Sequence, residues 1–261
     1  MKNFRYSGSE YTDPGLKNND DSSLFMAYTN KKEFLLFLAV ADGVGGLKNG
    51  DLASGFIIDQ LKVWFEEEKK HLLEVNLQEA TLLIYDKVIE IHKALLVINE
   101  EKEITSGSTL TAALLFKTDF LVLHIGDSRA YLYDGKACRQ ITKDQTEGQL
   151  MRDQGIFREE EINHAMEKTI IQCVGQRQIN PLIYTGTLPE TYQFIVCSDG
   201  LSNLFSELDF ADQLGVETSG KTKLKTMAAI VRQRGEKDNI TGVLTGRIVD
   251  EKGDETGAES K

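Results

Sequence analysis

The sequence predicts an α+β fold in which helices and strands form separate layers. Residues 51–69 carry apolar side chains at helical spacing, and a second helical pattern starts at Asn76. Residues 109–142 instead consist of short apolar or alternating runs that are broken by turn residues. Because strands are bracketed by pairs of helices, with no regular βαβ alternation, we expect a layered α+β architecture.

The first two helices are expected to form a hairpin over one side of a sheet. Asn76 with Glu79 three residues later resembles a capping box, which marks the start of the second helix. The apolar positions of the first helix recur three or four residues apart, at Ala53, Ile57, Leu61 and Trp64.

The strands are predicted from apolar runs and from the turns between them. The longest apolar run covers residues 34–41, far fewer than the roughly 20 that span a bilayer, and so predicts a buried strand. The breaks at 117–119, 126–128 and 134–135 are too short for helical crossovers, so we expect the strands that they join to be antiparallel neighbours. Asp134-Gly135 is the strongest hairpin signal and predicts a type I′ turn.

The second half of the chain continues the same mixture. We expect a helix at 145–158, then a charged, solvent-facing stretch, and a further helix at 221–234, with strands at 192–197 and 240–249. Residues 250–261 are polar and contain no apolar anchor, so we expect them to be disordered.

Composition excludes several classes of partner. The net charge of −11 on 261 residues repels polyanions, which argues against nucleic acid and anionic membranes. The first residues contain no apolar stretch like a signal peptide, so we expect a cytoplasmic protein. Cys138, Cys173 and Cys197 lie far apart and predict buried thiols in a reducing compartment rather than a metal site.

Three apolar strands end in an aspartate that is preceded or followed by glycine or a small polar residue. These aspartates are Asp42, Asp127 and Asp199, and two further acidic sites contain Asp20 and Asp238. Any one Asp-Gly pair is most simply a turn, but the joint pattern is harder to explain by turns alone. If the carboxylates meet, each raises the pKa of the others unless a cation lies between them. Oxygen ligands without histidine or thiolate favour magnesium or manganese over zinc or copper.

The chain resembles the type 2C (PPM) family of metal-dependent serine/threonine protein phosphatases, especially its compact bacterial members. The resemblance implies a four-layer αββα sandwich of two mainly antiparallel β-sheets flanked by helices. It also implies a single phosphatase domain over residues 1–249, with a flap segment at about 146–168. The matching motifs follow the family order from about position 12 to 246: Asn19-Asp20-Asp21-Ser22, Ala41-Asp42-Gly43-Val44-Gly45-Gly46, Gly107-Ser108-Thr109-Leu110-Thr111-Ala112, Ile125-Gly126-Asp127-Ser128-Arg129-Ala130-Tyr131, Ile141-Thr142-Lys143-Asp144, Cys197-Ser198-Asp199-Gly200-Leu201 and Asp238-Asn239-Ile240-Thr241.

The resemblance implies a dinuclear site for two Mn²⁺ or Mg²⁺ ions. Asp42 would bridge both ions, and the Gly43 carbonyl would bind one of them. Asp199 and Asp238 would hold one ion and Asp20 the other; Asp42, Asp199 and Asp238 are thus the candidate catalytic residues. Two further carboxylates would have lesser roles. Asp21 would support the ligands without binding an ion, and Asp127, with Asp199, would match the third, weaker metal site of the family. Two ions about 3.5 to 4 Å apart can lower the pKa of a shared water, so that no protein nucleophile is needed.

The substrate side of the site departs from the family pattern. The position where relatives usually carry a phosphate-gripping arginine is Leu16, and Lys17 is the nearest cation and the candidate phosphate contact. Val44 stands where some members have a histidine, so the general acid is unassigned. His124 is the histidine closest in sequence to a site residue, but packing is its default role.

Two functions stay open on the sequence. The first is hydrolysis of phosphoserine and phosphothreonine in proteins by a metal-activated water. The missing arginine leaves the alternative of an inactive pseudo-phosphatase that binds phosphoproteins or regulates a partner. A phosphohydrolase with an aspartyl nucleophile is not favoured, because no Asp-x-Asp follows an early apolar strand. The expected partners are phosphoproteins and a cognate Ser/Thr kinase, with the protein acting as a monomer.

Overall fold

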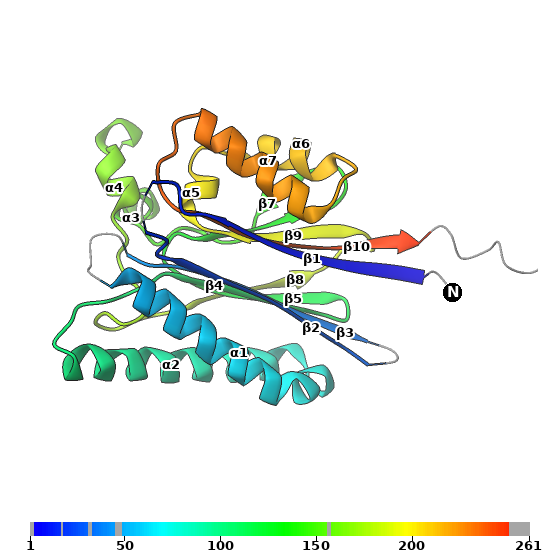
Figure 1. The fold of residues 1–261 in the computed structure, drawn as a ribbon, viewed down its shortest axis with the longest axis horizontal. Helices are drawn as coiled ribbons and strands as arrows, with labels where there is room; N and C mark the ends of the chain where they lie inside the picture. Colours follow the sequence, from blue (N-terminus) through cyan, green and yellow to red (C-terminus); the bar gives the residue numbers. More distant parts are fainter. Residues whose placement is uncertain (1–2, 17, 31–32, 45–48, 156–157, 251–261) are drawn as a thin grey trace, which may run out of the picture.

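The protein is a sandwich of two five-stranded antiparallel sheets with helices on both outer faces (Figure 1). This computed structural model describes residues 3–16, 18–30, 33–44, 49–155 and 158–250. In spatial order, sheet A contains β1 (Asn3–Asp13), β10 (Ile240–Asp250), β9 (Tyr192–Cys197), β6 (Arg129–Tyr133) and β7 (Cys138–Gln140). Sheet B contains β2 (Asp21–Thr29), β3 (Phe34–Asp42), β4 (Leu110–Phe116), β5 (Asp119–Ile125) and β8 (Leu182–Thr187). The predicted α+β sandwich is confirmed.

Strand β3 shows how the apolar run at residues 34–41 serves two layers. Leu35 and Phe37 pack toward the helices that cover sheet B, whereas Leu36 and Leu38 belong to the cluster between the sheets. Alternate side chains point to opposite faces of a strand, so a strand buried on both faces is apolar throughout. This places β3 at the centre of the molecule and its last residue, Asp42, at the rim of the core.

Two long helices cover sheet B, and three shorter ones cover sheet A. Helices α1 (Gly50–Glu74) and α2 (Leu77–Glu101) form the predicted hairpin. The Asn76 side chain accepts the Glu79 N–H at 3.0 Å, as the capping pattern predicts. On sheet A lie α5 (Asp199–Ser202), α6 (Glu207–Gly215) and α7 (Gly220–Gln233).

Several local predictions differ from the structure. β5 and β6 are not neighbours but lie in opposite sheets, because the chain crosses between the layers at Gly126, where φ is +101°. The hairpin between β6 and β7 is confirmed, but Gly135 has positive φ and Asp134 does not, so the turn is not type I′.

The segment 146–168 contains more regular structure than the sequence predicts. Helix α3 (Glu147–Gln154) is shorter than expected, since Gly155 ends it in the left-handed conformation. The charged stretch that follows forms the 3₁₀ turn η1 (Glu159–Glu161) and helix α4 (His164–Lys168). Beyond Asp250 the predicted disordered tail lies outside the described residues.

Two predictions from composition can be compared with the structure. Cys138, Cys173 and Cys197 are buried and form no disulfide, as expected. In the part of the chain that is described, no helix is both long and apolar enough to cross a membrane.

Candidate active site

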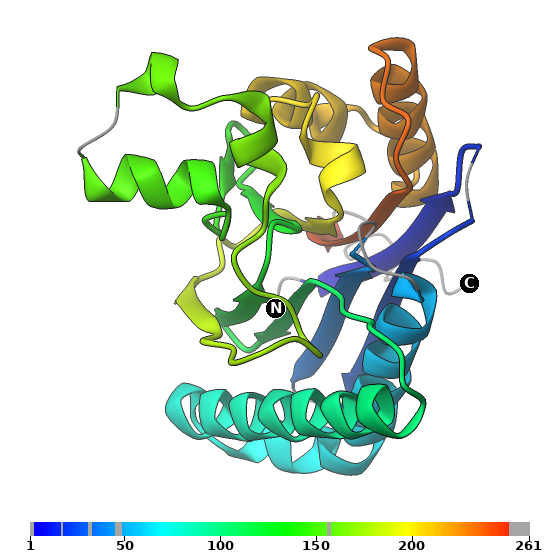
Figure 2. The ribbon, with the colours of Figure 1, turned by 90° about the vertical axis from the view of Figure 1, so that its left-hand side faces the viewer.

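The acidic motifs meet at one end of the sandwich, the end that faces the viewer in Figure 2. Asp42 ends β3, Asp127 follows β5, Asp199 follows β9 and Asp238 precedes β10. These four side chains line a cavity of about 180 Å³, together with Val44, Thr109, Lys168 and Ile170. Residues that are up to 196 positions apart in sequence thus surround one small space.

Burial and mutual repulsion raise the pKa values of these carboxyl groups. Burial raises the pKa of Asp42 well above its usual range, and the charges of Asp21, Asp199, Asp127 and Asp238 raise it further. The pKa of Asp127 rises to about 8, mainly through burial and then through the charge of Asp199. Burial, followed by the charge of Asp238, also raises the pKa of Asp199. Carboxylates in this arrangement are costly to ionise together unless positive charge is present.

Asp21 lies beside Asp42 but does not line the cavity. It pairs with Asp42 across the β2–β3 ladder. One carboxylate oxygen, Oδ2, accepts a hydrogen bond from Ser198 Oγ at 2.9 Å, while Oδ1 is buried without a partner among the described residues. Burial raises its pKa to about 6, with a further increase from the charge of Asp199. An unpartnered buried acceptor beside other carboxylates is a feature that a cation can satisfy.

Asp20 and Gly43 lie next to the cavity but do not line it. The Asp20 carbonyl accepts the Gly43 N–H at 3.0 Å. A Cβ at Gly43 would lie 2.5 Å from the Gly50 carbonyl carbon and 2.7 Å from the Asp20 carbonyl oxygen, so only glycine fits. Leu16 is fully exposed. Lys17, the predicted phosphate contact, lies outside the described residues.

Polar residues within the motifs hold the site together, and sequence reasoning assigned them no role. The Asn239 side chain accepts the Asp20 N–H at 2.9 Å and donates to the Pro14 and Asn18 carbonyls, each at 3.0 Å. Asn239 therefore ties the loop before β2 to the start of β10. The only sequence signal was its position beside Asp238.

The backbone of Asp42 is fixed by two hydroxyl groups. Thr109 Oγ1 accepts the Asp42 N–H at 3.0 Å, and Ser108 Oγ donates to the Asp42 carbonyl at 2.9 Å. Thr109 is in turn 2.8 Å from Ser128 Oγ. These contacts account for small hydroxyl residues in the motif that follows α2.

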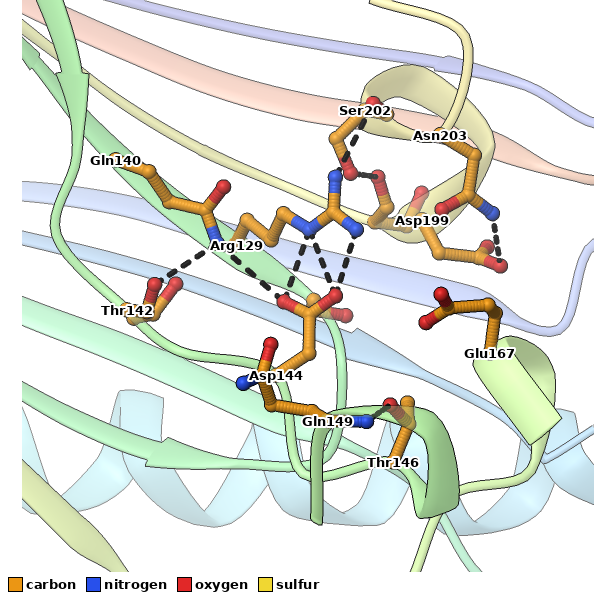
Figure 3. A network of polar contacts seen from close by, with 12 residues as sticks. Arg129, Gln140, Thr142, Asp144, Thr146, Gln149, Glu167, Asp199, Ser202 and Asn203 are labelled. Atoms are coloured by element: carbon orange, nitrogen blue, oxygen red, sulfur yellow. Dashed lines mark hydrogen bonds and ion pairs between the residues drawn. The ribbon is translucent and has the colours of Figure 1, made fainter. Parts of the chain in front are cut away.

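An ion pair between Arg129 and Asp144 is linked to helix α5 by a further hydrogen bond (Figure 3). Arg129 donates from Nε to Asp144 Oδ1 at 2.9 Å and from Nη2 to Oδ2 at 2.6 Å. Burial acts to lower the pKa of Arg129, but the hydrogen bonds and charge of Asp144 outweigh it and raise that pKa. Arg129 Nη1 also donates to the Ser202 carbonyl at 3.2 Å, and Asn203 Nδ2 donates to Asp199 Oδ2 at 2.8 Å. The network therefore positions the helix that begins with Asp199.

The donor groups at this end fit divalent cations that prefer oxygen ligands. Within the described ranges, no three His, Cys, Asp or Glu side chains lie close enough together to hold a metal ion as they stand. Mutual repulsion keeps carboxylates apart unless a cation lies between them. The cavity is lined by four aspartates, and the unpartnered Asp21 oxygen is beside them. This donor set suits magnesium or manganese.

Residues 8–244 match the family model described as Protein phosphatase 2C. The chain therefore belongs to this family and is a protein serine/threonine phosphatase of the compact bacterial type.

Its relatives and structural neighbours agree with this assignment. The chain is 28% identical to the serine/threonine phosphatase stp of Listeria welshimeri over 240 residues, which cover 90% of this chain and 92% of that protein. It is 29% identical to PstP of Mycobacterium tuberculosis, with 89% of this chain and 43% of PstP covered.

Two crystal structures illustrate the shared fold. A bacterial serine phosphatase superimposes with a TM-score of 0.83 at 26% identity, covering 95% of this chain and all of that one. The catalytic domain of PstP, solved in complex with two manganese ions, superimposes with a TM-score of 0.75 at 27% identity and covers 95% of this chain and 100% of that chain.

Proposed function

We propose that this phosphatase hydrolyses phosphoserine and phosphothreonine in proteins with water, at a site that holds two divalent metal ions. The observation that carries the proposal is the convergence of Asp42, Asp127, Asp199 and Asp238 on one cavity. The PstP catalytic domain, a structural neighbour, was solved with two manganese ions. The proposed ions are Mn²⁺ or Mg²⁺, because the donors are oxygens.

Each acidic residue has a proposed place around the ions. Asp42 and the Gly43 carbonyl would contribute to holding the ions. Asp199 and Asp238 would hold one ion, and Asp20 would hold the other. When bound, the ions would lower the pKa of a water molecule and neutralise the oxygens of the phosphoryl group.

Two further carboxylates complete the proposed site. Asp21 supports Asp42 across the β2–β3 ladder, where their backbones pair. Asp127, with Asp199, is proposed to hold a third and weaker ion. The raised pKa of Asp127 means that a cation must compete with a proton for this carboxylate.

Neighbouring polar residues hold the proposed ligands in position. Thr109 and Ser108 fix the Asp42 backbone, and Asn239 fixes the loop that carries Asp20. Preorganised ligands lose less conformational entropy when an ion binds. No side chain is required as a nucleophile, and the proposed macromolecular partners are phosphoproteins and the Ser/Thr kinase that modifies them.

The test is hydrolysis of a phosphothreonine peptide and of p-nitrophenyl phosphate by wild type, Asp42→Asn and Asp59→Asn. Asp59 is an exposed residue of α1 and provides a matched loss of one carboxylate far from the cavity. We expect turnover with MnCl₂ in wild type and Asp59→Asn, none with EDTA, and none in Asp42→Asn. Phosphopeptide binding without turnover would instead favour the pseudo-phosphatase alternative.

A further inference from the structure

The cavity with the four aspartates contains one basic residue among its described lining residues, and that residue is Lys168. A phosphomonoester carries close to two negative charges near neutral pH. Such a group must approach four carboxylates, so a positive side chain at the cavity wall would add to the attraction from any bound cations. The charge of Lys168 already acts on Asp199, where it favours the ionised carboxylate.

The backbone at Lys168 is held toward the cavity by the segment around it. Lys168 is the last residue of α4, whose first turn is capped by Asn163. The Glu147 N–H donates to the Thr169 carbonyl at 2.9 Å, and Ile170, which lines the same cavity, bridges to Thr146.

The neighbouring residue anchors the helix from its other side. Glu167 accepts a hydrogen bond from Arg152 Nη1 of α3 at 3.0 Å, and Arg152 also pairs with Glu159. The ion pair joins α4 to α3 and holds Glu167 toward Arg152, which leaves Lys168 on the cavity wall. The position of Lys168 is therefore set by local structure that spans both helices.

Two other basic side chains of the described residues near the site have partners of their own. Arg129 is held by Asp144, and Arg232 donates to the Asp13 side chain and to the Asp238 carbonyl. By contrast, Lys168 is exposed and forms no ion pair within 4.0 Å with another described residue. Its ammonium group is thus available to a ligand.

A second, larger cavity of about 770 Å³ adjoins the first, and Lys168 lines both of them. The larger cavity is bordered by α3, α4 and the residues after α5, including Gln149, His164 and Asn203. It is large enough for a short peptide segment, whereas the smaller one suits a phosphoryl group. Lys168 therefore lies where the phosphate of a bound phosphopeptide would meet its peptide chain.

We propose that Lys168 contacts the phosphoryl group of the substrate, and that α4 is thereby part of the active site. This inference rests on the proposed function, since it assumes that the aspartate cavity is where phosphate is hydrolysed. The proposal gives the site a positively charged side chain. The position where the family usually carries an arginine is occupied here by Leu16, which is fully exposed. A lysine ammonium is a point charge on a flexible stem, so the contact is expected to be salt-sensitive and not bidentate.

The experiment compares Lys168→Met, Lys168→Arg and Arg158→Met with wild type. Arg158 lies in the same segment, is exposed and lines neither cavity, so its loss removes an equal charge away from the site. The readouts are kcat and KM on both phosphate esters with manganese, and calorimetric binding of inorganic phosphate to the manganese-loaded protein.

We expect Lys168→Met to weaken phosphate binding and to lower kcat/KM on both esters by about tenfold, the size of one charge-assisted hydrogen bond. Lys168→Arg should recover most of the loss, Arg158→Met should resemble wild type, and Tm should not change in any variant. Phosphate affinity and kcat/KM that are unchanged in Lys168→Met would overturn the inference.

The two proposals can fail separately. If wild type turns over with metal and Lys168→Met matches it, only the role of Lys168 is wrong. If wild type shows no metal-dependent turnover, the proposed function is wrong. The calorimetric comparison still decides whether Lys168 contacts phosphate, because it does not depend on hydrolysis.

Discussion

Replacing Arg129 tests how much of the active-site end depends on one ion pair. In the variant Arg129→Met, the Asp144 carboxylate loses its three contacts with the guanidinium, at 2.6, 2.9 and 3.0 Å. The two side chains are only 20% and 15% exposed, so water replaces the lost partner incompletely. Removing one member of a buried ion pair costs about 3 to 5 kcal/mol, and the residual exposure places our expectation near 3 kcal/mol.

The assay is urea unfolding of wild type, Arg129→Met, Asp144→Leu and the double variant. Each single substitution should lower the free energy of unfolding by about 3 kcal/mol, because each leaves one charge without its partner. The double variant should lose less than the sum, with a coupling energy of about 2 kcal/mol. Strictly additive losses, or a single loss below about 1 kcal/mol, would show that the pair does not stabilise the fold in this way.

Three further predictions follow from other contacts. Gly200→Ala should cost more than about 3 kcal/mol, because its Cβ would lie 2.0 Å from the Asn239 carbonyl oxygen. By contrast, Gly55→Ala in α1 should stabilise by about 0.5 to 1 kcal/mol in the same urea assay, because its Cβ would lie no closer than 4.0 Å to the nearest atom, Ser22 Oγ. Asn239→Ala should weaken manganese binding, measured by calorimetry, and cost about 2 kcal/mol, since three hydrogen bonds disappear. Burial lowers the pKa of His124 in the folded protein to about 4. As the pH falls below about 6.5, His124 is therefore protonated first in the unfolded chain, and the folded protein loses stability from there toward pH 4. The difference in the free energy of unfolding between wild type and His124→Gln, measured without metal, should narrow by about 2 kcal/mol between pH 7 and pH 5. A stability difference between wild type and His124→Gln that is the same at pH 7 and pH 5 would contradict the lowered pKa of His124.

Elements with a strong local pattern were predictable from the sequence. The strand over residues 34–41 is buried on both faces and is therefore apolar throughout, and α2 starts at a capping residue that is visible in the sequence. The four aspartates could be grouped because each follows or precedes a strand at the same end of the sandwich. The family resemblance supplied the order of the motifs along the chain.

Features that depend on distant pairing were not predictable in the same way. β1 contains many polar residues and exists because it pairs with β10 along its whole length, more than 220 positions away. The turn at Gly126 is compatible with a hairpin, but the two strands that it joins pair with different partners in opposite sheets.

The same reason explains why supporting residues at the site were missed. Asn239 and Ser198 act through hydrogen bonds to residues 219 and 177 positions away, and a side chain's distant partner leaves no local pattern. Lys168 lines the cavity through the packing of α4 against α3 and the bridge between Thr146 and Ile170 that follows α4. Its sequence surroundings are merely those of a charged stretch.

The central claim is that the aspartate cavity holds two divalent ions, and anomalous scattering from crystals grown with manganese tests it most directly. We expect two strong peaks about 3.5 to 4 Å apart, with Asp42 between them, Asp199 and Asp238 at one and Asp20 at the other, and both peaks absent in Asp42→Asn. If the wild-type crystals show no anomalous peaks in the cavity, or show manganese peaks only elsewhere on the protein, the account is contradicted.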